Sequence, residues 1–373
     1  MKMTVLTISC SILFFTHGIV SSQSSEALKT DLTSLADEYL KINSEASGVM
    51  AAVDYPNTLN WKYTVGHMGQ KKENELQGDE PFIAASITKT FVAACMLQLE
   101  EEGLLSLEDK AIQYLDEKMV KRLTAFEGKT YEKELTVEHL LRHTSGINDY
   151  LNEGQVHLNA LKTEPEKRYS LQDRIDIALK ITPSINRLGK YKYSNTNYIL
   201  LGMIAEKIEK KNIADIIESR IVKPLGLENT SLKPSKEVLP KMFKGYYTDW
   251  DLTEFTLNFN RMNSAGGILT NIDDLLLFGK AVFSGKLFKS KSTLDKMLDF
   301  EKGYGLGVML YGKSRKTGRI MGHNGFDPGY TCYLAYLEKQ KATIVTVINQ
   351  SELKVVMPAF LIVKTVDSIK KSL

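Results

Sequence analysis

The chain has 373 residues, 43% of them hydrophobic and 25% charged, which is typical of a globular protein. Its 48 basic and 45 acidic residues give a net charge of +3, without a long basic run, so nucleic acid is not an expected partner. The length suits one large domain or two closely packed ones.

The first 22 residues have the features of a signal peptide. Lys2 supplies a positive charge, Val5 to Val20 are mostly apolar, and the small residues up to Ser22 offer a cleavage site before Gln23. We therefore expect export, to the periplasm or the exterior of the cell, after cleavage of residues 1–22. An uncleaved N-terminal membrane anchor is the alternative, although the apolar stretch is short for a spanning helix.

In chain order, the hydrophobic pattern predicts a helix, two short strands, a run of mainly helical segments, four strands and a final helix. The predicted helices cover residues 27–42, 86–102, 135–143, 171–181, 198–210, 213–221, 272–283 and 355–369. The predicted strands cover residues 48–53, 61–65, 305–311, 318–321, 330–337 and 342–349.

Strands at both ends of the chain, with helices between them, predict an α/β fold of the α+β type. We expect one antiparallel sheet built from both termini and flanked by helices, with a largely helical inserted part. The predicted single domain covers residues 23–373, with the sheet part at about 27–106 and 288–373 and the helical part at about 107–287. A cleft between the two parts is the natural place for a site.

Residues 86–89, Ser86-Ile-Thr-Lys89, open the second predicted helix. Three positions apart at a helix start, Ser86 and Lys89 lie on one face, so a hydroxyl nucleophile meets an amine that can act as a base. Unpaired backbone N–H groups at the same helix start can stabilise an oxyanion. Alone, the motif is also typical of an ordinary helix start with a solvated lysine.

Two later segments offer partners for the serine. Tyr193 can relay or accept a proton, and Asn195 can bind a substrate amide. His323 lies between glycines in Gly322-His-Asn-Gly325, where it can supply a polar or positive group beside a cleft. Each segment alone is also typical of a turn.

The remaining histidines and cysteines favour structural roles. His139 and His143 lie four residues apart, but the residues between them lack the glutamate of a zinc-peptidase helix. Cys95 and Cys332 are the two cysteines beyond the leader. We expect both to be buried free thiols, with a disulfide as the alternative.

Taken in order, Ser-x-x-Lys, Tyr-x-Asn and His-x-Gly resemble the active-site motifs of the serine β-lactamase/DD-peptidase superfamily. The chain is most similar to the branch that contains class C β-lactamases, D-aminopeptidases and β-lactamase-like esterases. Further similar segments are spread over most of the chain after the leader: residues 140–146, 193–202, 224–230, 265–274 and 304–307.

The resemblance implies a role for each motif residue. Ser86 is the expected nucleophile of an acyl-enzyme, and Lys89 and Tyr193 are expected to move its proton, either one serving as the formal base. Asn195 is expected to hold a substrate amide or Lys89. The expected oxyanion hole combines the backbone N–H groups of Ser86 and Phe326. The implied chemistry needs no metal or organic cofactor.

The third motif departs from class C β-lactamases, which have Lys-Thr-Gly where this chain has His323-Asn324-Gly325. Asn324 and Phe326 replace hydroxyl residues that often bind a substrate carboxylate, and a neutral histidine is a weak anion partner. We expect an exported serine hydrolase of D-amino-acid peptides, similar to D-alanyl-D-alanine carboxypeptidases, or another β-lactamase-related hydrolase. A carboxylesterase and a penicillin-binding sensor with little turnover are the alternatives. The expected partner is a small molecule or peptide: a cell-wall peptide, a β-lactam or an ester.

Overall fold

The computed structural model describes residues 15–72, 74–151, 163, 169–181, 188–258, 263–351 and 359–371, without the side chains of residues 15–24, 256, 258, 359 and 360. Most of the predicted signal peptide, residues 1–14, lies outside the described residues. The same holds for residues 355–358, where the last predicted helix begins.

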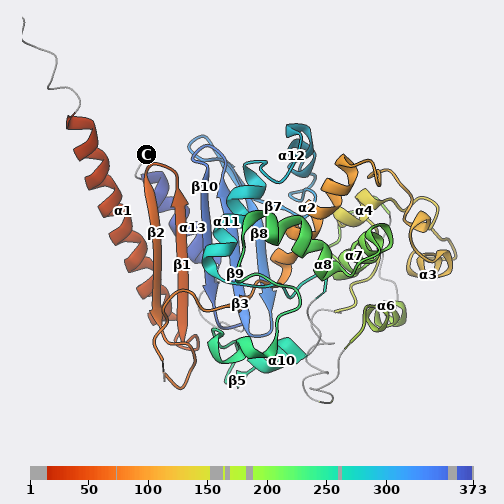
Figure 1. Ribbon diagram of the computed structural model, residues 1–373, viewed down its shortest axis with the longest axis horizontal. Helices are drawn as coiled ribbons and strands as arrows, with labels where there is room; N and C mark the ends of the chain where they lie inside the picture. The colour runs from red at the N-terminus through yellow and green to blue at the C-terminus, as the bar shows by residue number, and fades with distance from the viewer. Residues whose placement is uncertain are drawn as a thin grey trace, which may run out of the picture.

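A six-stranded antiparallel sheet forms the centre of the molecule (Figure 1). Its order is β2-β1-β10-β9-β8-β7, so strands from the two ends of the chain pair in its middle, with Val49 opposite Ile348. This arrangement confirms the predicted α+β fold. The strands are β1 (Gly48–Tyr55), β2 (Leu59–Gly66), β7 (Met309–Ser314), β8 (Gly318–Asp327), β9 (Tyr330–Leu337) and β10 (Ala342–Ile348).

Strand β8 extends further than its sequence pattern indicates. We expected a strand over residues 318–321 and a glycine-rich turn after it, but β8 continues to Asp327 and pairs with β9 from Ile320 to Asp327. The turn prediction for residues 322–326 is therefore wrong. Pairing with a fully buried neighbouring strand outweighs the low strand propensity of the glycines.

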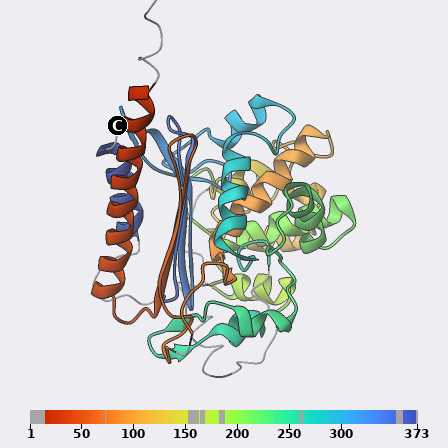
Figure 2. The same cartoon turned by 60° about the vertical axis from the view of Figure 1, so that its left-hand side comes forward.

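Helices cover both faces of the sheet (Figure 2). On one face lie α1 (Phe15–Ile42) and α13 (Ala359–Lys371), where Leu32, Ile362 and Val366 share a buried cluster with strand residues. α11 (Ile272–Phe283) packs on the opposite face against β1, β9 and β10. It thus belongs with the sheet, although residues 272–283 fall in the stretch assigned to the helical part by sequence.

The other helices build the second part of the molecule, apart from the sheet (Figure 1). The described α-helices there and around it are α2 (Thr88–Glu101), α3 (Glu117–Leu123), α4 (Val137–Leu141), α6 (Leu171–Lys180), α7 (Asn195–Glu209), α8 (Ile213–Ile217), α9 (Lys223–Leu225), α10 (Thr253–Asn258) and α12 (Lys291–Met297). A π-helical turn, Glu218–Val222, joins α8 to α9. Two small strand pairs complete the fold: β3 (Phe82–Ile83) with β6 (Leu269–Thr270), and β4 (Tyr246–Tyr247) with β5 (Trp250–Asp251).

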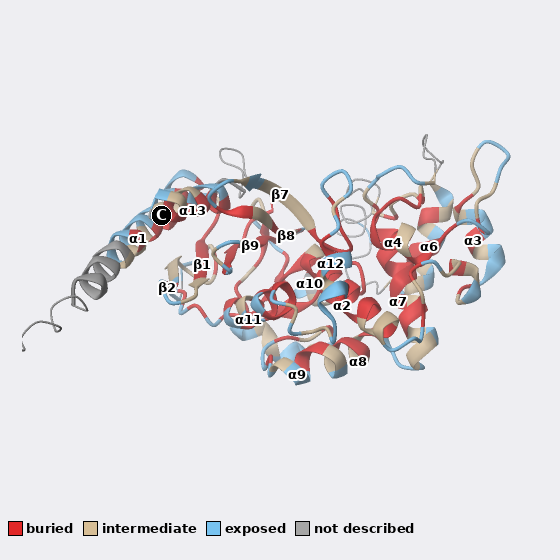
Figure 3. Cartoon of the chain, turned by 90° about the horizontal axis from the view of Figure 1, so that it is seen from above, coloured by how far each residue is buried: buried red, intermediate tan, exposed pale blue. Residues whose placement is uncertain are grey.

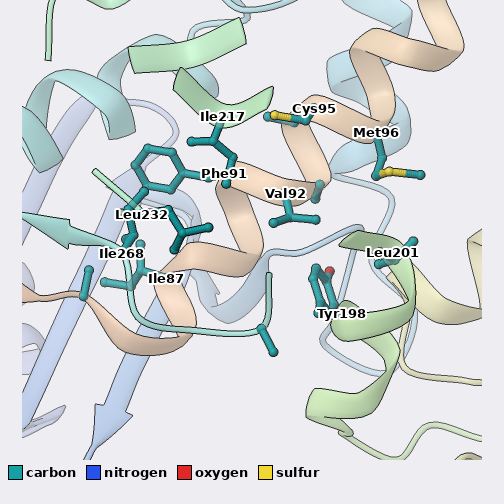
Figure 4. Close-up of a cluster of buried hydrophobic side chains, with 14 of the residues drawn as sticks. Ile87, Phe91, Val92, Cys95, Met96, Tyr198, Leu201, Ile217, Leu232 and Ile268 are labelled. Atoms are coloured by element: carbon teal, nitrogen blue, oxygen red, sulfur yellow. The ribbon is translucent and has the colours of Figure 1, made fainter. Parts of the chain in front are cut away.

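Helix α2 runs through the interior between the two parts. Eleven of its 14 residues are buried, so it is apolar on nearly every side rather than on one stripe. Figure 4 shows Phe91, Val92 and Met96 among side chains from other elements, and Figure 3 shows α2 as buried as the neighbouring α7. Phe91 stacks on Phe278 of α11 with ring centroids 3.5 Å apart. A lysine at the start of such a helix is removed from water.

Two sequence predictions concern the N-terminus and the cysteines. The backbone is already helical at Phe15, so α1 passes through the predicted cleavage site before Gln23. Of the helices that the structure describes, none is long and apolar enough to cross a membrane. Cys95 and Cys332 are buried and free, as predicted.

Candidate active site

A tight turn between β3 and α2 presents Ser86. Ala85, just before it, has a φ of +47°, a conformation that L-residues rarely adopt. Two hydrogen bonds fix the turn: the Thr88 hydroxyl donates to the carbonyl of Ala85 (2.6 Å) and accepts from the backbone N–H of Ile268 (3.1 Å). Ser86 sits in the short 3₁₀ turn η1 (Ala85–Ile87) and remains partly exposed. The strained turn therefore leaves Ser86 partly accessible at the start of the buried helix α2.

Lys89 lies fully buried next to Ser86. Its Nζ is 3.0 Å from Ser86 Oγ, 2.7 Å from Asn195 Oδ1 and 2.5 Å from the carbonyl oxygen of Ala265. The two latter oxygens can only accept, so a neutral amine donates its two N–H groups to them and keeps its lone pair for the Ser86 hydroxyl. Burial lowers the pKa of Lys89 to about 7, against an opposing effect of Asp149. Near neutral pH, a large share of Lys89 is thus able to accept a proton.

Tyr193 covers Lys89 from the other side. Lys89 Nζ lies 4.9 Å from the centroid of the tyrosine ring. Burial raises the pKa of Tyr193 well above its ordinary value, and the nearby Ser86 hydroxyl opposes this effect. The phenol therefore stays protonated, which favours Lys89 over Tyr193 as the group that first takes the serine proton. The buried phenol oxygen forms no well-aligned hydrogen bond with any described residue.

Asp149 is a site residue that the sequence prediction missed. Its Oδ2 accepts from the side-chain amide of Asn195 (2.8 Å), and its Oδ1 accepts from the backbone N–H of Leu151 (3.0 Å). Because the carboxylate takes the amide N–H, the Oδ1 of Asn195 must face Lys89. Burial raises the pKa of Asp149, whereas these hydrogen bonds and Lys89 oppose the rise. Asp149, Asn195 and Lys89 thus form one chain of contacts that ends at Ser86.

The segment around His143 holds the tyrosine motif in place. The backbone N–H of Ser194 donates to His143 Nδ1 (3.2 Å), and the His143 and Tyr193 rings lie 4.2 Å apart. The Ser145 hydroxyl donates to the side-chain oxygen of Asn197 in the first turn of α7 (2.6 Å). Burial lowers the pKa of His143 well below its usual value. A neutral His143 that accepts from the backbone fits the structural role expected for it.

Strand β8 brings the third motif against the Ser86 turn. Among the described residues, the ladder between β7 and β8 ends at Gly322, so residues 323–327 pair with β9 alone and have one open edge near η1. At Gly325 a Cβ atom would come within 2.3 Å of the Ala84 carbonyl oxygen and 2.5 Å of Cys332 Sγ. Only glycine lets the strand approach this closely.

His323 is placed differently from what its predicted binding role requires. Its side chain is fully buried and accepts a hydrogen bond at Nε2 from the Tyr304 hydroxyl (3.0 Å), because Nδ1 must donate to the carbonyl of Asn324 (2.6 Å). Burial lowers the pKa of His323 to about 3. The imidazole is therefore neutral and supplies no positive charge to a substrate. Its contacts with Tyr304 and the Asn324 carbonyl stabilise β8.

A narrow pocket opens onto Ser86. Phe326 forms part of its wall with a side chain that is 62% exposed, while Asn324 is half-buried and lies outside the lining. Arg174, a buried cation that the sequence reasoning did not single out, also lines the pocket and lies over the ring of Tyr150. The other lining residues are Ala85, Tyr150, Leu151, Asn195, Asn263, Ala265, Gly266 and Asp327. Ser86, Asn195 and Phe326 therefore line one pocket, and their predicted roles remain predictions.

Comparisons with known proteins agree with this geometry. A family model described as Beta-lactamase matches residues 33–362. Penicillin-binding protein 4* of Bacillus subtilis (strain 168) is 27% identical over 338 residues, which cover 84% of this chain and 70% of that protein. The putative penicillin-binding protein PbpX of the same organism is 26% identical over 276 residues, 72% of this chain and 62% of that protein.

Solved structures share the fold. The D-amino acid amidase from Ochrobactrum anthropi SV3, complexed with D-phenylalanine, has a TM-score of 0.77 at 22% identity and covers 93% of this chain and 100% of its own. The octameric penicillin-binding protein homologue from Pyrococcus abyssi has a TM-score of 0.72 at 23% identity. The match covers 88% of this chain and 74% of that chain.

Proposed function

Because the chain belongs to the β-lactamase family and is a serine hydrolase of that superfamily, we propose that it cleaves amide bonds next to D-amino acids through an acyl-enzyme on Ser86. The observation that carries the proposal is the contact of Lys89 Nζ with Ser86 Oγ at 3.0 Å, held by Asn195 and the carbonyl of Ala265. A buried amine with a pKa of about 7 is matched to proton transfer at neutral pH.

In the first step, neutral Lys89 takes the proton of the Ser86 hydroxyl while Oγ bonds to the substrate carbonyl carbon. The carbonyl electron pair moves to oxygen, where the backbone N–H groups of Ser86 and Phe326 are expected to donate. The carbon–nitrogen bond then breaks, and the leaving amine takes the proton from Lys89, directly or through the Tyr193 hydroxyl. In the second step, water attacks the ester, gives its proton to the same base, and Ser86 leaves with that proton.

The walls of the site support the proposed substrate class. The open edge of β8 offers backbone groups to an extended peptide, as an additional strand would use them. His323 is neutral and buried, so it provides no cation for a terminal carboxylate, whereas Arg174 is a cation that lines the pocket. These features fit D-amino-acid amides and D-peptides, and a terminal carboxylate would be held by Arg174 rather than by His323. The names of similar proteins, penicillin-binding protein and D-amino acid amidase, support the same substrate class.

The test is a substrate panel with the purified protein. D-Amino-acid amides, peptides that end in D-Ala-D-Ala and their L-isomers are incubated in parallel, and the released amine or D-alanine is measured. We expect turnover of the D-isomers and none by Ser86→Ala. Equal turnover of both isomers, or none of either with intact acylation of Ser86, would contradict the proposal.

Esterase activity is a second candidate, and Phe326 is the observation that favours it. An exposed aromatic ring in the pocket wall offers an apolar surface to an acyl chain. Nitrocefin and p-nitrophenyl esters of increasing chain length separate the possibilities. Preference for longer esters, lost in Phe326→Ser, supports an esterase, whereas a long-lived adduct with a fluorescent penicillin supports a sensor with little turnover.

Export is also part of the proposal. It is supported by Lys2, the apolar stretch from Val5 to Val20 and the small residues before Gln23. Mass spectrometry of the protein recovered from its native cells tests it. A mature N-terminus at or near Gln23 supports export with cleavage, and a retained N-terminus in the membrane fraction supports the anchored alternative.

A further inference from the structure

One end of the six-stranded sheet concentrates basic side chains. The β7–β8 and β9–β10 turns lie side by side there, because antiparallel pairing brings these strand ends together. Residues 313–319, 338–341 and 364–371 hold nine basic and two acidic residues, a net charge of +7 in a chain whose total is +3. The rest of the chain therefore carries a net charge of −4. We call these three segments the basic end.

Hydrogen bonds join the three segments into one surface. Lys316 Nζ donates to the carbonyl of Lys370 at the end of α13 (2.8 Å), and Lys339 Nζ donates to the carbonyl of Arg315 (2.8 Å). The side-chain amide of Gln340 also donates to the carbonyl of Lys316 (3.0 Å). The basic residues are thus held together by the backbone they contact rather than scattered over the molecule.

The two acidic residues of the basic end are already engaged. Glu338 pairs with Arg319 (2.7 Å), and Asp367 pairs with Lys370 (3.1 Å). Arg315, Lys341 and Lys371 are exposed. A shallow groove beside α1 is lined by four lysines of this surface, Lys316, Lys364, Lys370 and Lys371, together with Glu38 and Asp367. The excess positive charge therefore faces solvent.

The direction of helix α1 indicates what this surface meets. Leu28 of α1 and Ile369 of α13 belong to one buried cluster, so the earlier residues of α1 continue past the basic end. From Leu28 back to Phe15 an α-helix covers roughly 20 Å, and Figures 1 and 2 show α1 projecting beyond the sheet on this side. While residues 1–22 are attached, the apolar stretch from Val5 to Val20 holds this end next to the membrane.

We propose that the basic end binds the anionic surface of a phospholipid bilayer. Clustered lysine and arginine side chains are attracted to anionic headgroups, and the attraction decays within a Debye length. The Ser86 pocket stays clear of such a surface. From Gly318 at the basic end to Phe326 at the pocket, β8 spans eight residues, roughly 25 Å, so a docked molecule keeps its site open to water.

The test is vesicle co-sedimentation of the full-length protein. Binding to vesicles of phosphatidylcholine alone is compared with binding to vesicles of phosphatidylcholine mixed with phosphatidylglycerol, at low and high salt. The ratio of the two affinities cancels the contribution of the apolar N-terminal stretch, which enters both membranes. We expect a preference for anionic vesicles that weakens with salt and falls by about tenfold or more in the triple variant Arg315→Glu, Lys341→Glu, Lys371→Glu.

A matched variant controls for net charge. Lys118→Glu, Lys121→Glu and Lys129→Glu make the same change in charge on exposed residues of the helical part, away from the sheet. This variant should keep the preference, and both variants should melt at the temperature of the parent. Equal binding to both kinds of vesicle, an equal loss in both variants, or binding to free inorganic polyphosphate without binding to anionic vesicles would overturn the proposal.

Discussion

Replacing Asp149 by asparagine should change the pH at which the enzyme becomes active. Asp149 contacts Asn195, and Asn195 contacts Lys89, so one amide group separates the carboxylate from the ammonium. The negative charge raises the pKa of Lys89, which burial has lowered to about 7. The base must be neutral to accept the Ser86 proton, so activity rises with pH through that pKa. Removing the negative charge lowers the pKa of Lys89 further. The acidic limb of the pH–rate profile, where activity rises with pH, should therefore move to lower pH.

The size of the shift follows from the spacing. Two hydrogen bonds of 2.8 and 2.7 Å across one amide put the charges roughly 6 Å apart. At an effective dielectric constant of about 20, this corresponds to roughly 2 to 3 kcal/mol. We therefore expect the limb to move down by about one to two pH units. The maximal rate should also fall, because Asn195 is no longer held in one orientation.

The assay is acylation by a fluorescent penicillin, measured as a rate over a range of pH, with the melting temperature recorded for each variant. Asp176→Asn, an exposed aspartate on α6, makes the same change in side chain and charge away from Lys89 and should leave the limb in place. A limb that stays put in Asp149→Asn, or moves to higher pH, in a protein that melts normally would refute the reasoning.

Three further predictions concern single residues. Lys89→Met should slow penicillin acylation by about a thousandfold or more, because the base is lost. The melting temperature should stay or rise, because a buried charge is removed. Retained acylation would exclude Lys89 as the base. Gly325→Ala should lower the free energy of unfolding by about 1 to 3 kcal/mol and the acylation rate at least tenfold, since its Cβ would press on the Ala84 carbonyl. Chemical denaturation measures the first quantity and penicillin labelling the second. No change in either would contradict the close approach of β8 to the Ser86 turn. His323→Asn should lower the melting temperature but leave the pH–rate profile unchanged between about pH 5 and 8. The pKa of His323 is about 3, so its ring does not titrate in that range. Loss of the acidic limb in this variant would show that His323 titrates.

The sequence supported the fold and the three motifs because both rest on local patterns. Helical periodicity after Ser86 and alternating apolar runs near both termini depend on neighbouring residues, and the structure contains those elements. The serine and lysine meet because they are three residues apart, and Asn195 joins them from 106 residues away along the chain. That second contact was expected only from the family resemblance.

The missed features depend on contacts between distant segments. Asp149 carries no signal of its own, since its partner Asn195 is 46 residues further on. Nothing near His323 in sequence indicates that Tyr304 would occupy its Nε2 and that burial would keep it neutral. Likewise, the glycines of residues 322–325 predict a turn until the pairing with β9 is known. Side-chain chemistry was readable from sequence, whereas its electrostatic state was not.

The pairing of β1 with β10 has a consequence for how the protein comes into being. Val49 pairs with Ile348, nearly 300 positions later, and β10 in turn carries β9 and β8. Ser86 and Lys89 are synthesised early. The strand that lies next to the nucleophile, β8, is added only when most of the chain has been made. Such long-range closure makes folding slow. A chain shortened before β8 is therefore expected to hold its nucleophile but lack hydrolase activity, so the cell makes no working enzyme from an incomplete message.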